Sequence, residues 1–148
     1  MMKKRPRVLF NASVILAGLY SPSGASGVLL ALVKKRKIDG IISEIIFSEV
    51  IRHADKIGKG RLQSEKKIID IFGEVVSPPG VPSVEKYYDA VTDRGDAHVL
   101  ACYDEEKCDI LVTLDKKHLL VLQGKIKGFQ ILSPGQLVKI LRDRVKSR

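Results

Sequence analysis

Four residues of this chain have side-chain types and positions that suit metal chemistry. Asn11 follows the first apolar run of the sequence, Asp115 follows a later apolar run, Asp96 starts a helical pattern, and Glu49 lies within another. Carboxylate and amide oxygens are hard ligands, suited to Mg²⁺ or Mn²⁺. Crowded carboxylates repel one another unless a divalent cation neutralises them. A cation held in this way polarises a phosphodiester and activates water, so the four residues suggest metal-assisted hydrolysis.

Apolar runs that predict strands alternate along the chain with periodic stretches that predict helices. Strands are expected at residues 8–10, 41–42, 75–76, 110–112 and 129–132. Helices are expected at residues 14–19, 27–37, 44–56, 62–72, 116–122 and 134–144, with another starting at residue 96 and a helical turn at 84–88. This alternation predicts one α/β domain over residues 1–148, with a central parallel sheet of about five strands and helices on both faces.

The predicted sheet would bring the four residues to one place. Ligands bind just beyond the carboxyl ends of the strands in an open parallel sheet, where Asp115 is expected. Asp96 opens its helix behind Thr92 and Asp93, which are good capping residues. If the first strand lies at the centre of the sheet, these side chains and Asn11 converge on one cleft. Glu49 fits the same cleft, since a carboxylate beside apolar groups is costly without a cation or hydrogen-bond partner.

Other polar residues are expected to lie outside this site. His98 is two residues past Asp96 and therefore points about 200° away on the helix, so we interpret it as a surface or packing residue. Asp104 would lie roughly 12 Å along the helix axis, too far to share a cation. Asp109 precedes its strand, at the opposite end of the sheet. The three histidines of the chain show no spacing typical of a ligand cluster.

The chain carries a formal net charge of +9, from 26 Lys and Arg against 17 Asp and Glu. Such a balance favours a polyanionic partner such as a nucleic acid, because each neutralised phosphate releases counterions. A solvated, lysine-rich surface, common in proteins from hot environments, explains the same charge without any nucleic acid. Charge alone leaves both interpretations open.

Composition argues against several classes of protein. No apolar run approaches the ~20 residues that a membrane span needs, so we expect no membrane partner. The basic start of the chain precedes only a short apolar run without a cleavage site, and we expect no signal peptide. Cys102 and Cys108 lack the paired spacing of a zinc site. We interpret them as reduced core thiols of a cytoplasmic protein.

One resemblance rests on five segments: RVLFNASVILAGLYSPSG, IISEIIFSEV, DRGDAHVLACY, CDILVTLDKKHLL and ILSPGQLV. In these segments, from Arg7 to about Leu137, the chain resembles the PIN-domain family, in the branch of toxins from toxin–antitoxin systems. The resemblance implies a three-layer α/β/α fold and metal-dependent endoribonuclease activity. It places the acids of the site at the positions of Asn11, Glu49, Asp96 and Asp115.

The chain departs from the family pattern at two positions of the site. The first acid of the family is Asn11 here, and the Thr-Asn that usually follows it is replaced by Ala12 and Ser13. His118 stands where relatives often carry a further aspartate. Asn11 offers a carbonyl oxygen but brings no charge and cannot act as a base. We therefore expect weaker Mg²⁺ binding than at a fully acidic site.

Three hypotheses follow. The first is a nuclease acting on RNA with Mg²⁺ or Mn²⁺ held by Asp96, Asp115, Glu49 and Asn11, and with Arg94 near the phosphates; as a toxin it would bind an antitoxin and form a homodimer. The second is a PIN-fold protein that binds RNA or a partner protein without cutting, which Asn11 favours. The third is a nucleotide-binding module, and the lack of a Gly-rich loop after the first strand argues against it.

Overall fold

The computed structural model describes residues 5–146, and its centre is a sheet of four parallel strands in the order β2-β1-β3-β4. The strands are β1 (Arg7–Phe10), β2 (Asp39–Ile41), β3 (Ile110–Val112) and β4 (Ile131–Leu132). Val8 pairs with Gly40 on one side and with Ile110 on the other, and Leu111 pairs with Ile131. The predicted parallel sheet, with the first strand inside it, is confirmed.

The strand predicted at residues 75–76 is reduced to one isolated bridge, so the sheet has four strands in the described part of the chain. Val76 pairs with Ser43. Its main-chain N donates to Ile42 O at 2.9 Å, and its carbonyl accepts from Glu44 N at 2.9 Å. Two prolines follow almost at once, and proline has no N–H with which to continue the ladder.

The helices occupy most of the segments between and after these strands. They are α1 (Ala12–Tyr20), α2 (Ala25–Lys34), α3 (Glu44–Lys56), α4 (Arg61–Phe72), α5 (Val81–Glu85), α6 (Ala97–Glu105) and α7 (Pro134–Lys146). Three short 3₁₀ helices are η1 (Tyr88–Ala90), η2 (Arg94–Asp96) and η3 (Leu120–Leu122). Ser43 caps α3 by accepting a hydrogen bond from Ile46 N at 3.2 Å, which stabilises the start of that helix.

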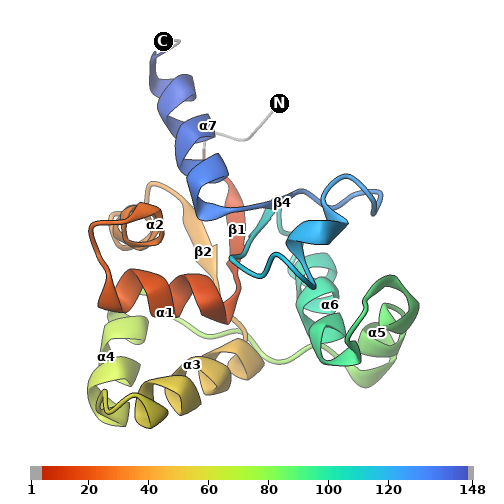
Figure 1. The fold of residues 1–148 in the computed structure, drawn as a ribbon, viewed down its shortest axis with the longest axis horizontal. Helices are drawn as coiled ribbons and strands as arrows, with labels where there is room; N and C mark the ends of the chain where they lie inside the picture. The colour runs from red at the N-terminus through yellow and green to blue at the C-terminus, as the bar shows by residue number, and fades with distance from the viewer. Residues whose placement is uncertain (1–4, 147–148) are drawn as a thin grey trace.

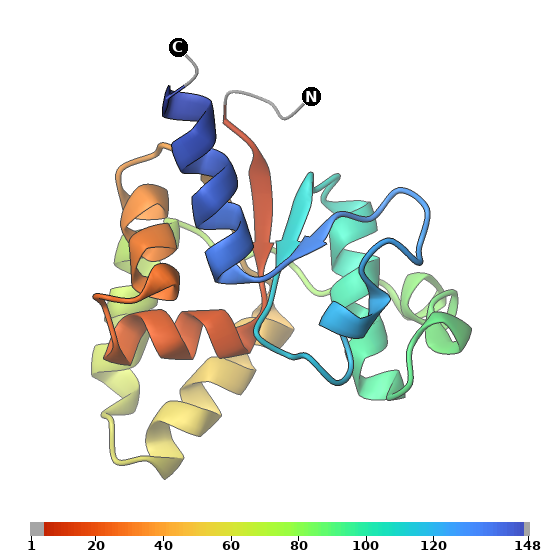
Figure 2. The same cartoon turned by 45° about the horizontal axis from the view of Figure 1, so that its top comes forward.

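The helices form layers on both sides of the sheet. α2 and α7 pack against each other on one side, and α6 lies on the other (Figures 1 and 2). The residues of β3 and residues 8–10 of β1 are fully buried as a result. Strands covered on both faces read as continuous apolar runs, and this is the pattern from which they were predicted. The rings of Phe10 and Phe72 pack edge to face, with their centroids 5.3 Å apart, and this contact joins α4 to the core.

The helix predicted at residues 116–122 is wrong, because this segment forms a turn that ends in η3. The side chain of Asp115 accepts a hydrogen bond from His118 N at 2.9 Å. The carbonyl of Asp115 accepts from Leu119 N and from Leu120 N. Asp115 thus caps this segment much as Ser43 caps α3, but the main-chain bonds after Leu119 join residues three apart, so the chain continues as turns and the 3₁₀ helix η3 instead of an α-helix. The capping bond keeps residues 115 and 118 on the same side of the chain.

Cys102 and Cys108 are both buried and free, as predicted for core thiols. Burial raises the pKa of each thiol to about 12. Within residues 5–146 no single helix is long and apolar enough to cross a membrane, and α1 with α2 passes that test only as a pair bent by 94°.

Candidate metal centre

Asp96, Asp115 and His118 meet beyond the carboxyl end of β3. One ligand atom from each lies within 4.8 Å of the other two. The Nδ1 atom of His118 is 3.4 Å from Asp115 Oδ2 and 3.7 Å from Asp96 Oδ2. The three side chains come from η2 and from the turn after β3, at the edge of the sheet where a parallel sheet usually binds ligands.

Asn11 ties the end of β1 to the loop after β3. Its side-chain oxygen accepts hydrogen bonds from the hydroxyls of Ser13 and Thr113, each at 3.0 Å. The Thr113 hydroxyl accepts from Asp115 N at 3.0 Å, and the Ser13 hydroxyl accepts from Leu114 N at 3.2 Å. The amide oxygen therefore uses both of its lone pairs within the protein, and the main chain around Asp115 is held at two points.

Asp96 has the most unusual surroundings of the three cluster residues. Its Oδ2 atom is buried and makes no hydrogen bond with any residue of the described chain. Burial raises the pKa of its carboxyl above the usual value, and the nearby charge of Asp115 raises it further, while His118 opposes this shift. A buried carboxylate oxygen without a partner is costly. A cation bound beside it would remove that cost.

Glu49 reaches the neighbourhood of this cluster from α3. Its Oε1 atom lies 3.1 Å from His98 Nε2, a hydrogen bond between α3 and α6. The His98 side chain is only 12% exposed, and its Nδ1 atom is buried without a hydrogen-bond partner among the described residues. The charge of His98, like that of His118, opposes the rise in the pKa of Asp96. His98 is mostly buried, as expected for a packing residue, but it was expected to lie apart from the site and instead bonds Glu49, one of the four predicted site residues.

The structure thus brings two of the four predicted site residues, Asp96 and Asp115, into one cluster. Asn11 is connected to the main chain of Asp115 through Thr113, and Glu49 bonds His98 outside the group of ligand atoms. The predicted ligand roles of all four remain predictions.

His118 is the residue that sequence reasoning missed, because the three histidines showed no common ligand spacing. The sequence does contain a signal for His118. It follows Asp115 by three residues, and it stands at a position where relatives often carry aspartate.

Asp104 and Asp109 lie outside the cluster, as expected. Asp104 accepts a hydrogen bond from the Tyr87 hydroxyl at 2.8 Å. Asp109 accepts one from Arg7 N at 2.8 Å, at the start of β1 and thus at the opposite edge of the sheet. Neither residue belongs to the group of ligand atoms formed by Asp96, Asp115 and His118.

Comparison with known proteins identifies the family. A model of the PIN domain matches residues 7–117, well over half of the chain. The chain belongs to the PIN-domain family. No curated protein sequence matches it.

Two solved structures resemble this PIN domain, and both resemblances concern the fold alone. VapBC2 from Rickettsia felis, bound to a DNA fragment from their promoter, has a TM-score of 0.61 and 15% sequence identity, covering 86% of this chain and 98% of that chain. FitAB bound to an IR36 DNA fragment has a TM-score of 0.61 and 14% identity, covering 86% of this chain and 94% of that chain.

The cluster of this PIN domain fits a divalent cation. Ligand atoms that share a cation at about 2.1 Å lie roughly 3–4 Å apart, and both contacts of His118 Nδ1 fall in that range. The buried, unpartnered Asp96 Oδ2 supplies a free acceptor atom. Two carboxylates and an imidazole are also a ligand set typical of divalent metals. Asp96, Asp115 and His118 would therefore hold the ion.

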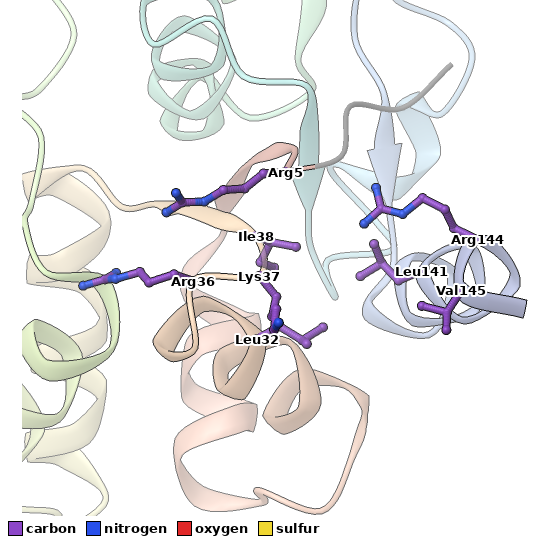
Figure 3. Close-up of a pocket in the computed structure, with 8 residues that line it drawn as sticks. All are labelled: Arg5, Leu32, Arg36, Lys37, Ile38, Leu141, Arg144 and Val145. Carbon is purple, nitrogen blue, oxygen red and sulfur yellow. The ribbon is translucent and has the colours of Figure 1, made fainter. Parts of the chain in front are cut away.

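A large cavity lies near the amino-terminal ends of β1 and β2, away from this cluster. It has a volume of about 580 Å³ and lies between the chain that leads into β2 and the helix α7 (Figure 3). Its lining is aliphatic and cationic: Arg5, Leu32, Arg36, Lys37, Ile38, Leu141, Arg144 and Val145. Since no carboxylate lines it, this cavity is not a candidate for the metal site.

Proposed function

We propose that this PIN domain is a divalent-metal-dependent endoribonuclease. The observation that carries the proposal is that Asp96, Asp115 and His118 lie together at the carboxyl ends of the strands. Asp96 Oδ2 is buried there and has no hydrogen-bond partner among the described residues. The two cations that we propose for the site are Mg²⁺ and Mn²⁺. The family resemblance, which implies metal-dependent cleavage of RNA, supports this assignment.

Each residue of the site has a distinct proposed role. Asp96 and Asp115 bind the cation, which supplies a Lewis acid for the phosphodiester and lowers the pKa of water. Asn11 and Thr113 hold the loop that carries Asp115. Glu49 is bonded to His98 and would provide a further carboxylate for the ion. Its exposed fraction of 30% leaves it accessible to a water molecule or to the ion.

RNA is the proposed substrate. The net charge of +9 favours a polyanion. Arg94 is exposed two residues before Asp96, and its guanidinium lies 4.8 Å from the centre of the Tyr88 ring. An arginine stacked on an aromatic ring beside an acidic site offers a phosphate contact and a surface for an unpaired base. We propose that this pair holds the RNA strand next to the metal.

We further propose that the chain is the toxin of a toxin–antitoxin pair and binds an antitoxin in the cytoplasm. The resemblance in sequence to that branch of the family supports this proposal, as does the likeness of the fold to the VapBC2 and FitAB structures. A homodimer is proposed from the resemblance alone. Sedimentation of the purified chain, alone and with the product of a neighbouring gene, tests both proposals.

The test of the nuclease proposal compares the wild type with Asp96→Asn. Cleavage of a labelled single-stranded RNA is measured with Mg²⁺, with Mn²⁺ and with a chelator. Asp96→Asn should abolish the metal-dependent cleavage, while the matched change Asp104→Asn, which removes an acid bound to Tyr87 instead, should retain it. Full activity in Asp96→Asn would refute the assignment.

A second candidate function is binding of RNA or a partner protein without cleavage. Asn11 is the observation that favours it, because the site has one carboxylate fewer than the family pattern implies and the Asn11 oxygen already accepts two hydrogen bonds. The variant Asn11→Asp distinguishes the two functions.

A further inference from the structure

His118 is placed by its own main chain to face both acids of the cluster. Its N–H donates to Asp115 Oδ1 at 2.9 Å, which closes a turn over residues 115–118 and fixes the position of the His118 main chain from which the imidazole extends. From there Nδ1 reaches Asp115 Oδ2 at 3.4 Å and Asp96 Oδ2 at 3.7 Å. The side chain is 29% exposed, so the ring lies at the mouth of the site rather than in the core.

The imidazole changes the kind of cation that the cluster suits. Mg²⁺ is bound through carboxylates, phosphates and retained water, all oxygen ligands. Imidazole suits later divalent metals, and affinity for a site containing nitrogen rises along the series from Mn²⁺ towards Cu²⁺. A site in which a histidine replaces a carboxylate therefore loses charge, which weakens Mg²⁺, and gains a nitrogen, which transition metals prefer.

Two further observations make His118 the third ligand rather than Asn11. The oxygen of Asn11 is occupied by two hydroxyl donors. The Asp96 oxygen nearest to the imidazole is the buried atom that has no hydrogen-bond partner in the described chain. The free acceptor and the imidazole nitrogen thus face the same point, whereas Asn11 is used to hold the loop.

We propose that His118 ligates the metal together with Asp96 and Asp115, and that this centre prefers a divalent transition metal, with Mn²⁺ as its representative, to Mg²⁺. This inference rests on the proposed metal-dependent function, and it goes further by naming the ligand and the class of ion.

Calorimetric titration of the whole chain with Mn²⁺ and with Mg²⁺ tests the proposal without measuring activity. In His118→Phe, which removes the nitrogen and keeps a ring, Mn²⁺ affinity should fall at least about tenfold, by more than Mg²⁺ affinity does. His118→Asp should reduce or reverse the preference for Mn²⁺ over Mg²⁺, because it replaces the imidazole nitrogen with a charged oxygen ligand. His53→Phe is the matched control: it removes an exposed histidine from α3, and metal affinity should not change.

A second readout reports the ligand directly. The visible absorption of bound Co²⁺ depends on the atoms that coordinate it, so the spectrum of the wild type should change in His118→Phe and stay unchanged in His53→Phe. Circular dichroism of each variant shows whether it has folded.

The outcomes separate the two proposals. Unchanged Mn²⁺ affinity and Co²⁺ spectrum in folded His118→Phe, with binding lost in Asp96→Asn, would overturn the role of His118 and leave the metal centre intact. A wild type that binds Mg²⁺ as tightly as Mn²⁺ would overturn the preference. If no ion binds to the wild type, both this inference and the metal-dependent function fail, and the imidazole acts only as an internal partner of the two carboxylates.

Discussion

The side-chain oxygen of Asn11 and the hydroxyl of Thr113 lie 3.0 Å apart in a hydrogen bond that joins β1 to the end of β3. The same hydroxyl accepts the main-chain N–H of Asp115 at 3.0 Å. A single buried hydroxyl thus connects the first strand to the loop that carries an acid of the cluster. The position of Asp115 depends on this connection, which gives Asn11 a structural role in addition to any role in metal binding.

Thr113→Val should weaken both the fold and the site. The side chain is fully buried, so the change removes one hydrogen-bond donor and one acceptor while keeping the shape. Leaving Asp115 N without its partner should cost about 1–3 kcal/mol in the free energy of unfolding, measured by urea denaturation. Metal affinity should fall as well. Thr113→Ser keeps the hydroxyl and is the control; equal stability of the valine variant would contradict the role given to this bond.

Asn11→Asp should raise metal affinity and cleavage. The carboxylate can accept the same two hydroxyl donors that Asn11 accepts, so the fold should persist. It adds a negative charge next to a loop that already carries Asp115, which lowers the stability of the metal-free chain and raises the affinity for a cation. Calorimetry should show at least about a tenfold gain in affinity, the scale on which groups around a metal site act. A large gain in cleavage would show that the natural chain is a weakened nuclease; tighter metal binding without cleavage would favour the binding function.

The contribution of Asp96 to the stability of the metal-free chain should fall as the pH rises from about 4. Burial, followed by the charge of Asp115, raises the pKa of Asp96 in the folded state. The folded chain therefore binds more protons than the unfolded chain between the two pKa values, and stability is lost as the pH passes through the raised pKa. Asp96→Asn removes this loss, so without metal it should be more stable than the wild type at pH 7, with a smaller difference at pH 4.

Urea denaturation at several pH values, with a chelator present, measures this difference. Addition of Mn²⁺ should reverse the order of stability, because only the wild type retains the ligand and binding to the folded state stabilises it. If the difference between the two proteins were the same at pH 4 and at pH 7, the raised pKa of Asp96 would not account for it.

His98→Ala should affect Glu49 more than the metal cluster itself. The change removes the hydrogen bond at 3.1 Å between α3 and α6 and leaves space where a mostly buried ring was packed. A loss of about 1–3 kcal/mol in unfolding free energy is expected from the packing and the bond together. Metal affinity should fall less than in Asp96→Asn. An equal loss of affinity in the two variants would show that His98 belongs to the metal site.

The parts of the fold that were predicted from the sequence are those decided by local pattern. The runs at β1 and β3 are apolar at every position because both faces of those strands are covered, and α3 was placed at its observed ends since Ser43 caps it. The parallel sheet followed from the alternation of strands and helices. Asp96 and Asp115 were predicted, with Asn11 and Glu49, to converge on one cleft, because the carboxyl ends of parallel strands and the helix starts that follow them lie at one end of the sheet.

Two features of the fold differ from what the sequence pattern predicted. The expected third strand became a bridge at Val76, because prolines follow it and no further N–H continues the ladder. The expected helix after Asp115 is instead a turn followed by the 3₁₀ helix η3, in which the main-chain bonds join residues three apart and not four. That turn brought His118 to the acids.

Residue types and strand ends were therefore enough to find the acids of the site and its edge of the sheet. Which atoms face one another there depended on the tertiary structure. The pairing of Glu49 with His98 spans 49 residues, and the bond of Asn11 to Thr113 spans 102. No local pattern encodes such contacts, because they exist only when separate strands and helices have packed on one core.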